Sequence, residues 1–216
     1  MVQLIGRDYE ITLLTELLAG VENRTPAFVL VSGEAGVGKS RLVTEFSERA
    51  RESGAVVLSG GCLELDGGVI PYGPLVEALR LLVRQHGEQE ARRLAGPAWE
   101  ELGALITDFT DAAPAGPMMG AQTRVFGAVS RLLDHIGAQS PLVIVFEDVQ
   151  WAGTATLDLL AYLALTSSNQ RLMLLCSHQS KLPAGHPLRT KLAAPELNRR
   201  AQKISLEPFR GHLIYI

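Results

Sequence analysis

The sequence has few cysteines, and it has no long apolar run; each shortage excludes a class of protein. Its 216 residues include only Cys62 and Cys176, which are too few and too far apart for a disulfide framework or a cysteine-ligated metal cluster. No apolar segment approaches the ~18 residues that a membrane-spanning helix needs. A secretion signal begins with a basic segment followed by an apolar stretch, and the N-terminus has no such pattern. We therefore expect a cytoplasmic protein without membrane attachment.

The sequence also has no strong excess of charge of either sign. Its 20 basic and 23 acidic residues give a net charge of −3, which provides no general reason to expect a nucleic-acid surface. Hydrophobic residues make up 47% of the chain, enough to bury a substantial core. At this length we expect one compact α/β domain.

One stretch has the pattern of a phosphate-binding loop. An apolar, β-branched run at residues 28–31 leads into Gly33-Glu34-Ala35-Gly36-Val37-Gly38-Lys39-Ser40-Arg41, and a helical pattern follows. This reads G-x-x-x-x-G-K-S between a strand and a helix, the context that marks a P-loop. Such a turn aims backbone N–H groups at a triphosphate, and the helix N-terminus adds its partial positive charge. The alternative is a glycine-rich turn that contains Lys-Ser by chance, which the four specified positions and the flanks disfavour.

The residue types in this loop suit ATP or ADP with Mg²⁺. Gly33, Gly36 and Gly38 allow positive φ angles and a close approach of the backbone to the phosphate oxygens. Lys39 is expected to reach the β- and γ-phosphates, and the Ser40 hydroxyl is placed to ligate Mg²⁺. The sequence does not decide between adenine and guanine.

Two acidic residues follow the most continuous strand signal in the chain. Residues 142–146 are all apolar, and Glu147 and Asp148 come directly after them. Because ligands gather outside the carboxyl ends of parallel strands, these acids should face the P-loop crevice, as a Walker B motif does. We assign Glu147 to the Mg²⁺ site and Asp148 to polarising an attacking water, although the two roles could be exchanged. The alternative is an acidic strand end that caps the next helix.

Hydrophobic periodicity and turn residues predict the order of the elements. Helices are expected at residues 7–19, 39–52, from 74, 88–106, 122–137 and 154–166, the last capped by Thr154 or Thr156, and strands at 27–32, 55–59, 142–146, 171–177 and 203–206, with an insertion loop at 111–120. This order predicts a three-layer P-loop NTPase with a mainly parallel sheet, helices on both faces and a helical insertion around 74–137. The ATPase domain is expected to cover residues 1–209, with residues 210–216 unassigned.

Four segments in this order carry a family resemblance. Residues 4–10 (LIGRDYE), 33–42 (GEAGVGKSRL), 71–79 (PYGPLVEAL) and 147–152 (EDVQWA) resemble the AAA-type ATPase module of STAND proteins. More narrowly, they are similar to the N-terminal module of the large LuxR-type transcriptional regulators of actinobacteria. The resemblance covers about residues 4–209, nearly the whole chain.

The resemblance implies a nucleotide-operated switch. ATP would favour an open, often self-associated state, and slow hydrolysis or ADP would restore the closed one. In that family the leading Gly-Arg lies beside the nucleotide, so Arg7 is a candidate contact. The DNA-binding helix-turn-helix usually lies far downstream, so DNA would be reached only through domains absent from this chain. The chain is therefore expected to be an isolated domain, a fragment or a naturally short product.

The sequence departs from the family pattern at two positions. Gly153 stands where the family usually has an aspartate, which removes a capping or supporting carboxylate that Thr154 replaces only in part. Gln179 stands near the end of a predicted strand that commonly finishes with an arginine sensing the γ-phosphate. Loss of a transition-state arginine costs on the order of 10³ to 10⁵ in rate. We therefore expect ATP binding with very slow hydrolysis unless a neighbouring subunit supplies an arginine.

Two other functions stay open at this point. One is a working P-loop enzyme, such as a kinase or a motor ATPase. The other is a degenerate domain that serves only as a protein-interaction module without nucleotide affinity. Trp151, which follows the acidic pair, is interpreted as a core anchor in preference to a base-stacking platform.

Overall fold

The computed structural model describes residues 6–64, 69–103, 121–168 and 170–208, and within them five strands form one parallel sheet. The strands are β1 (Ala27–Gly33), β2 (Val56–Gly61), β3 (Leu142–Glu147), β4 (Leu172–Gln179) and β5 (Ala201–Leu206). Their order across the sheet is β2-β3-β4-β1-β5, and each neighbouring pair is parallel. The strands are apolar on both faces because helices cover both sides of the sheet.

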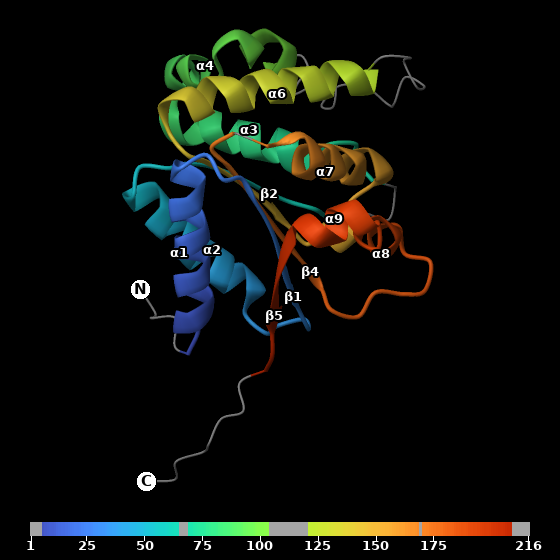
Figure 1. Ribbon diagram of the computed structural model, residues 1–216. Coiled ribbons are helices and arrows are strands. Elements are labelled where there is room, and N and C mark those ends of the chain that lie inside the picture. The colour runs from blue at the N-terminus through green and yellow to red at the C-terminus, as the bar shows by residue number, and fades with distance from the viewer. Residues whose placement is uncertain (1–5, 65–68, 104–120, 169, 209–216) are drawn as a thin grey trace.

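Two helices cover one face of the sheet, and the other helices cover the opposite face (Figure 1). Helices α1 (Asp8–Glu22) and α2 (Lys39–Glu52) lie on the first face. The second face carries α3 (Gly73–His86), α7 (Thr154–Thr166), α8 (Pro187–Leu192) and α9 (Pro195–Arg200), with α4 (Glu88–Ala95) and α6 (Ala121–Gln139) stacked beyond α3. Alternate residues of β1 enter two separate cores: Val29 and Val31 pack with α1 and α2, whereas Phe28 and Leu30 pack on the other side.

This architecture confirms the predicted three-layer α/β fold with a parallel sheet and helices on both faces. The predicted helical insertion corresponds to α3, α4, the helical residues 99–103 and α6. The predicted loop at 111–120 and the predicted tail at 210–216 lie outside the described residues. Among those that are described, no helix has both the length and the apolar character to cross a membrane.

Three predicted element details are wrong. The helix predicted at residues 7–19 continues through Gly20 to Glu22 as α1, because the side chain of Val21 is fully buried in the core and offsets the cost of a helical glycine. The helix predicted at 88–106 is interrupted by a 3-10 turn at Gly96–Ala98, where Gly96 has a φ of 54°. Helix α7 is capped by Gly153, with no side-chain bond.

Thr156 does not cap α7 because its hydroxyl makes a hydrogen bond to another segment of the chain. Its oxygen accepts a hydrogen bond from the backbone N–H of Tyr72 at 3.1 Å. Thr156 therefore ties the segment before α3 to the first turn of α7. Gly153 leaves the helix start without a side-chain acceptor, as the departure from the family pattern implied.

The end of β2 packs tightly on the start of α3. A Cβ atom at Gly60 would overlap the carbonyl oxygen of Pro74, so only glycine fits there. Next to it, the backbone N–H of Gly61 donates a 2.6 Å hydrogen bond to the Glu77 carboxylate. These contacts fix α3 beside the carboxyl end of the edge strand β2.

The strand order places β4 between the strand of the P-loop and the strand of the acidic pair. In the registers, Gly33 at the end of β1 lies opposite Gln179 of β4, and Cys176 of β4 lies opposite Phe146 of β3. The carboxyl ends of β1, β4 and β3 therefore meet at one edge of the sheet, where ligands of parallel sheets bind.

Candidate functional site

The P-loop turns from β1 into α2 through two glycines with left-handed backbone conformation. Gly36 has a φ of 75° and Gly38, the N-terminal cap of α2, a φ of 100°. No L side chain adopts these angles without strain, so glycine is required there. Gly33 differs from the prediction, because it lies in the extended strand. Its small size is needed since a Cβ would lie 2.7 Å from Val37 Cγ1.

The Lys39 side chain lies inside this turn. It is only 7% exposed, and its ammonium donates to the carbonyl oxygens of Gly33 at 3.1 Å and Glu34 at 3.0 Å. An ammonium carries three donor protons, so one proton is left for a ligand in front of the loop. The buried positive charge and the N-terminus of α2 together make the turn a site for an anion.

A cavity of about 320 Å³ opens in front of Lys39. Its lining combines most of the predicted loop residues with the end of β4 and the segment after β3: Ala35, Gly36, Gly38, Lys39, Ser40, Arg41, Asp148, Gln150, Trp151 and Gln179. The structure thus brings the P-loop, Asp148 and Gln179 together around one space.

Glu147 lies beside the predicted magnesium ligand Ser40. The Ser40 hydroxyl lies near enough to the Glu147 carboxylate to act on its pKa, and this carboxylate is partly buried at the end of β3. Burial raises the pKa of Glu147, the polar Ser40 hydroxyl opposes this rise, and the negative charges of Asp148 and Glu77 add to it. A carboxylate in such surroundings gains from a nearby cation, so this pair fits a divalent metal.

The remaining ligands of such a metal would come from phosphate oxygens and water. Within the described part of the chain, no three His, Cys, Asp or Glu side chains are grouped so that they could hold a metal ion. Mg²⁺ bound with nucleotide needs only one or two protein oxygens, which Ser40 and Glu147 provide. The donor set therefore fits Mg²⁺ with a triphosphate and does not fit a site made of protein ligands alone.

Gln150 holds Asp148 against the end of β4. The Asp148 N–H donates to Ser177 Oγ at 3.1 Å, and Gln150 Nε2 donates to Asp148 Oδ1 at the same distance. The Oε1 atom of Gln150 accepts a hydrogen bond from the N–H of Gln179 at 3.1 Å, and Gln150 is only 5% exposed. The backbone of Asp148 has a φ of 53°, in the left-handed region that few residues other than glycine adopt.

The sequence alone did not point to Gln150. Its only signal was a polar side chain in the turn directly after the acidic pair, at residues Val149–Trp151, where a long polar residue is buried only if it is hydrogen-bonded. Trp151 in the same turn is partly buried; it packs on the core as predicted and also lines the cavity.

A lysine missed by the sequence analysis lies at the outer edge of the loop. The Nζ atom of Lys181 is 2.6 Å from Glu34 Oε1, and this contact lowers the pKa of Glu34. Lys181 is 86% exposed at its side chain, so the ion pair adds little to stability. It does place a cation within two residues of Gln179.

Arg7 lies behind the P-loop. Its guanidinium donates to Glu207 O at 2.7 Å and to Val37 O at 3.4 Å, and it pairs with Glu10 at 3.0 Å. Arg7 is 7% exposed and thus fastens the loop to the segment after β5. Its direct contact with a nucleotide stays a prediction, since it is placed against the loop backbone.

The curated relatives of this chain are much longer proteins, and the chain matches only a small part of each. The uncharacterized protein R02095 of Rhizobium meliloti is 28% identical over 176 residues, which is 73% of this chain and 16% of that protein. ATPase family gene 2 protein homolog B of Bos taurus is 32% identical over 128 residues, 59% of this chain and 15% of that protein. The chain therefore spans about a sixth of the length of these relatives.

Among solved structures, the chain is similar to the Drosophila ORC bound to DNA, with 13% identity and a TM-score of 0.46 over 92% of this chain and 90% of that one. It is also similar to AMPPCP-bound DnaA from Aquifex aeolicus, with 12% identity and a TM-score of 0.44 over 96% and 48%. The family model described as the AAA ATPase domain matches residues 3–175, most of this chain. The chain belongs to the AAA ATPase domain family.

Proposed function

We propose that this AAA ATPase domain is an ATP-binding, slowly hydrolysing switch of a signal-transducing transcriptional regulator. The observation that carries the proposal is the cavity lined by Lys39, Asp148 and the uncharged Gln179. Such a site has the groups that bind a triphosphate, but β4 ends in an uncharged residue and not in an arginine that would stabilise the transferring phosphoryl group. Slow turnover suits a switch, because the ATP-bound state then lasts long enough to signal.

The regulator assignment rests on the resemblance of the four sequence segments to STAND proteins of the large LuxR type. On this proposal residues 1–209 form the switch domain and residues 210–216 have no assigned role. ATP binding favours self-association, and DNA is contacted only through domains outside this chain. The protein then works in the cytoplasm.

Each residue of the site has a task in this proposal. The loop from Gly33 to Arg41 binds the phosphates through its N–H groups, and the third N–H of Lys39 Nζ donates a hydrogen bond to a β- or γ-phosphate oxygen. Ser40 and Glu147 would hold Mg²⁺, which supplies positive charge to neutralise the phosphates. Asp148, whose carboxylate is held by the hydrogen bond from Gln150, orients the attacking water and takes its proton.

The proposal is tested by titrating the protein with ATP, ADP and GTP in the presence of Mg²⁺, while affinity, particle mass and phosphate release are followed together. We expect ATP and ADP to bind, particle mass to rise with ATP but not with ADP, and turnover to be slow. Rapid phosphate release, or phosphate transfer to an acceptor, would assign a working enzyme instead. A lack of affinity for every nucleotide would leave only an interaction module.

The acidic pair gives a second test. The double variant Glu147→Gln, Asp148→Asn should reduce Mg²⁺-dependent turnover to background while keeping part of the nucleotide binding, because Lys39 and the loop remain. Turnover is measured as phosphate release with and without Mg²⁺. The control variant Glu48→Gln, Glu52→Gln removes the same charge from exposed positions of α2. Undiminished hydrolysis in the double variant would show that the two acids are misassigned.

A further inference from the structure

The side chain of Gln150 joins two segments that face the nucleotide cavity. Its amide nitrogen donates to Asp148 Oδ1 at 3.1 Å, and its amide oxygen accepts a hydrogen bond from the backbone N–H of Gln179 at 3.1 Å. Gln150 is buried, and it lines the same cavity as Asp148 and Gln179. Both polar ends of the amide are therefore used between the turn after β3 and the end of β4.

The backbone of Asp148 is held in place without the Gln150 side chain. Its N–H donates to Ser177 Oγ at 3.1 Å, and its carbonyl oxygen accepts a hydrogen bond from the N–H of Trp151 at 2.9 Å. The neighbouring Val149 is fully buried in the core. The hydrogen bond from the Gln150 amide therefore constrains the Asp148 carboxylate and is not needed to fix the path of the chain.

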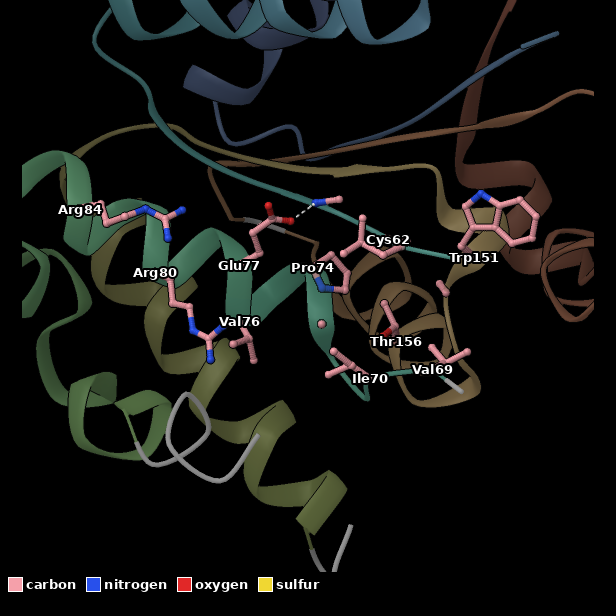
Figure 2. Close-up of a pocket in the computed structure, with 14 residues that line it drawn as sticks. Cys62, Val69, Ile70, Pro74, Val76, Glu77, Arg80, Arg84, Trp151 and Thr156 are labelled. Carbon is pink, nitrogen blue, oxygen red and sulfur yellow. Dashed lines mark hydrogen bonds between the residues drawn. The ribbon is translucent and has the colours of Figure 1, made fainter. Parts of the chain in front are cut away.

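The turn that carries Gln150 is also fixed by the packing of Trp151. This side chain packs on the core and forms part of the wall of a second cavity of about 290 Å³, which the end of β2 and helix α3 also line. Figure 2 shows the Trp151 ring at one end of this cavity. A variant that loses only the Gln150 amide therefore keeps the contacts that anchor the turn.

We propose that Gln150 is a positioning residue for ATP hydrolysis, which fixes the Asp148 carboxylate for the attacking water and ties its position to the end of β4. An aspartate side chain rotates about two bonds, so without this hydrogen bond the carboxylate takes several orientations. Orientations that point away from the water do not contribute to the reaction, and misplacing a catalytic group by about 1 Å can cost about 10²-fold in rate. This role of Gln150 rests on the proposed function, because it acts through the task assigned to Asp148.

The hydrogen bond to Gln179 makes the position of Asp148 depend on β4. Gln179, at the end of β4, lines the cavity in front of Lys39, where a bound triphosphate is expected. If the N–H of Gln179 moved away, the buried amide oxygen of Gln150 would be left without a hydrogen bond, which is unfavourable. A shift of the end of β4 on nucleotide binding is therefore expected to move the Gln150 amide, and the Asp148 carboxylate with it.

The test compares Gln150→Met with the wild type by single-turnover phosphate release at saturating ATP and by calorimetric ATP affinity, both with Mg²⁺. Methionine keeps the length of the side chain and removes both hydrogen bonds, so phosphate release should slow by about tenfold to a hundredfold. ATP affinity should stay within about twofold, because Lys39 and the P-loop are unaltered. The matched control Gln202→Met makes the same change at an exposed position of β5 and should alter neither quantity.

A second variant, Gln150→Asn, tests the bridge between the two segments. Asparagine keeps the amide on a side chain one carbon shorter, which cannot span from Asp148 to Gln179, so phosphate release should again be slower than in the wild type with ATP affinity retained. A wild-type rate in either variant, or a loss of ATP affinity in both, would overturn the positioning role. Absence of ATP binding or of phosphate release in the wild type would instead contradict the proposed function, so the two failures are distinguishable.

Discussion

Replacing Lys39 by alanine is expected to weaken ATP binding by about tenfold to ten-thousandfold. The substitution removes the charge-assisted hydrogen bond that the third Lys39 N–H makes to the phosphates, which contributes about 1.5–3 kcal/mol, and the attraction of the buried ammonium charge for the polyphosphate adds to this loss. The Lys39 ammonium is 7% exposed and already fixed by two loop carbonyls, so it is preorganised and needs little ordering when a triphosphate binds. A preorganised buried cation contributes more to affinity than a mobile lysine on the surface would.

The measurement is a calorimetric titration of the wild type and Lys39→Ala with ATP in the presence of Mg²⁺. The control is Lys203→Ala, because Lys203 is exposed on β5, where it pairs with Asn198, and its removal changes the net charge equally. Thermal melting without nucleotide verifies that both variants are folded, since Lys39→Ala also leaves the Gly33 and Glu34 carbonyls without their side-chain donor. Equal ATP affinity in wild type and Lys39→Ala would refute the assigned site.

The P-loop and the acidic pair were predictable because their signals are local. The loop that ends in Gly38-Lys39-Ser40 follows an apolar run that favours a buried strand, whichever strands lie beside it. Gly36 and Gly38 adopt the left-handed backbone that the loop pattern requires. The position of Glu147 at a strand end follows from the apolar run before it, and parallel pairing then brings it to the P-loop edge. Neither inference needed the order of the strands.

Contacts that depend on the strand order were not predictable. The insertion of β4 between β1 and β3 places Gln179 next to Gly33 and brings its N–H to the side chain of Gln150. Nothing in residues 147–151 alone shows that Gln150 bonds to a strand 29 positions away. The same holds for Lys181, whose partner Glu34 is 147 residues away in the sequence.

Two wrong details have a common physical cause, which is that tertiary contacts override local preference. Thr156 has the right chemistry for a helix cap, but the N–H of Tyr72 takes its hydroxyl. Glycine commonly ends helices, but α1 continues past Gly20 to Glu22 because Val21 is buried in the core.

Replacing Gln179 by arginine is expected to raise ATP turnover by about tenfold to a thousandfold. Gln179 lines the cavity together with Lys39 and Asp148, so a guanidinium at this position would lie beside the phosphates. A transition-state arginine contributes on the order of 10³ to 10⁵ in rate, and one placed in a site that has not adapted to it should recover only part of that. The backbone N–H of Gln179 bonds to Gln150 whatever the side chain is, so the position of Asp148 should be retained.

Single-turnover phosphate release with saturating ATP and Mg²⁺ measures the effect, because it separates the chemical step from nucleotide binding and product release. The control is Gln202→Arg, which adds the same charge at an exposed position of β5 outside the cavity. Lys181→Ala tests the cation that follows β4: if Lys181 already replaces the missing arginine, its removal lowers the wild-type rate and Gln179→Arg has little effect. An unchanged rate in both Gln179→Arg and Lys181→Ala would show that the end of β4 does not limit hydrolysis, and that slow turnover, if measured, has another cause than the charge at this position.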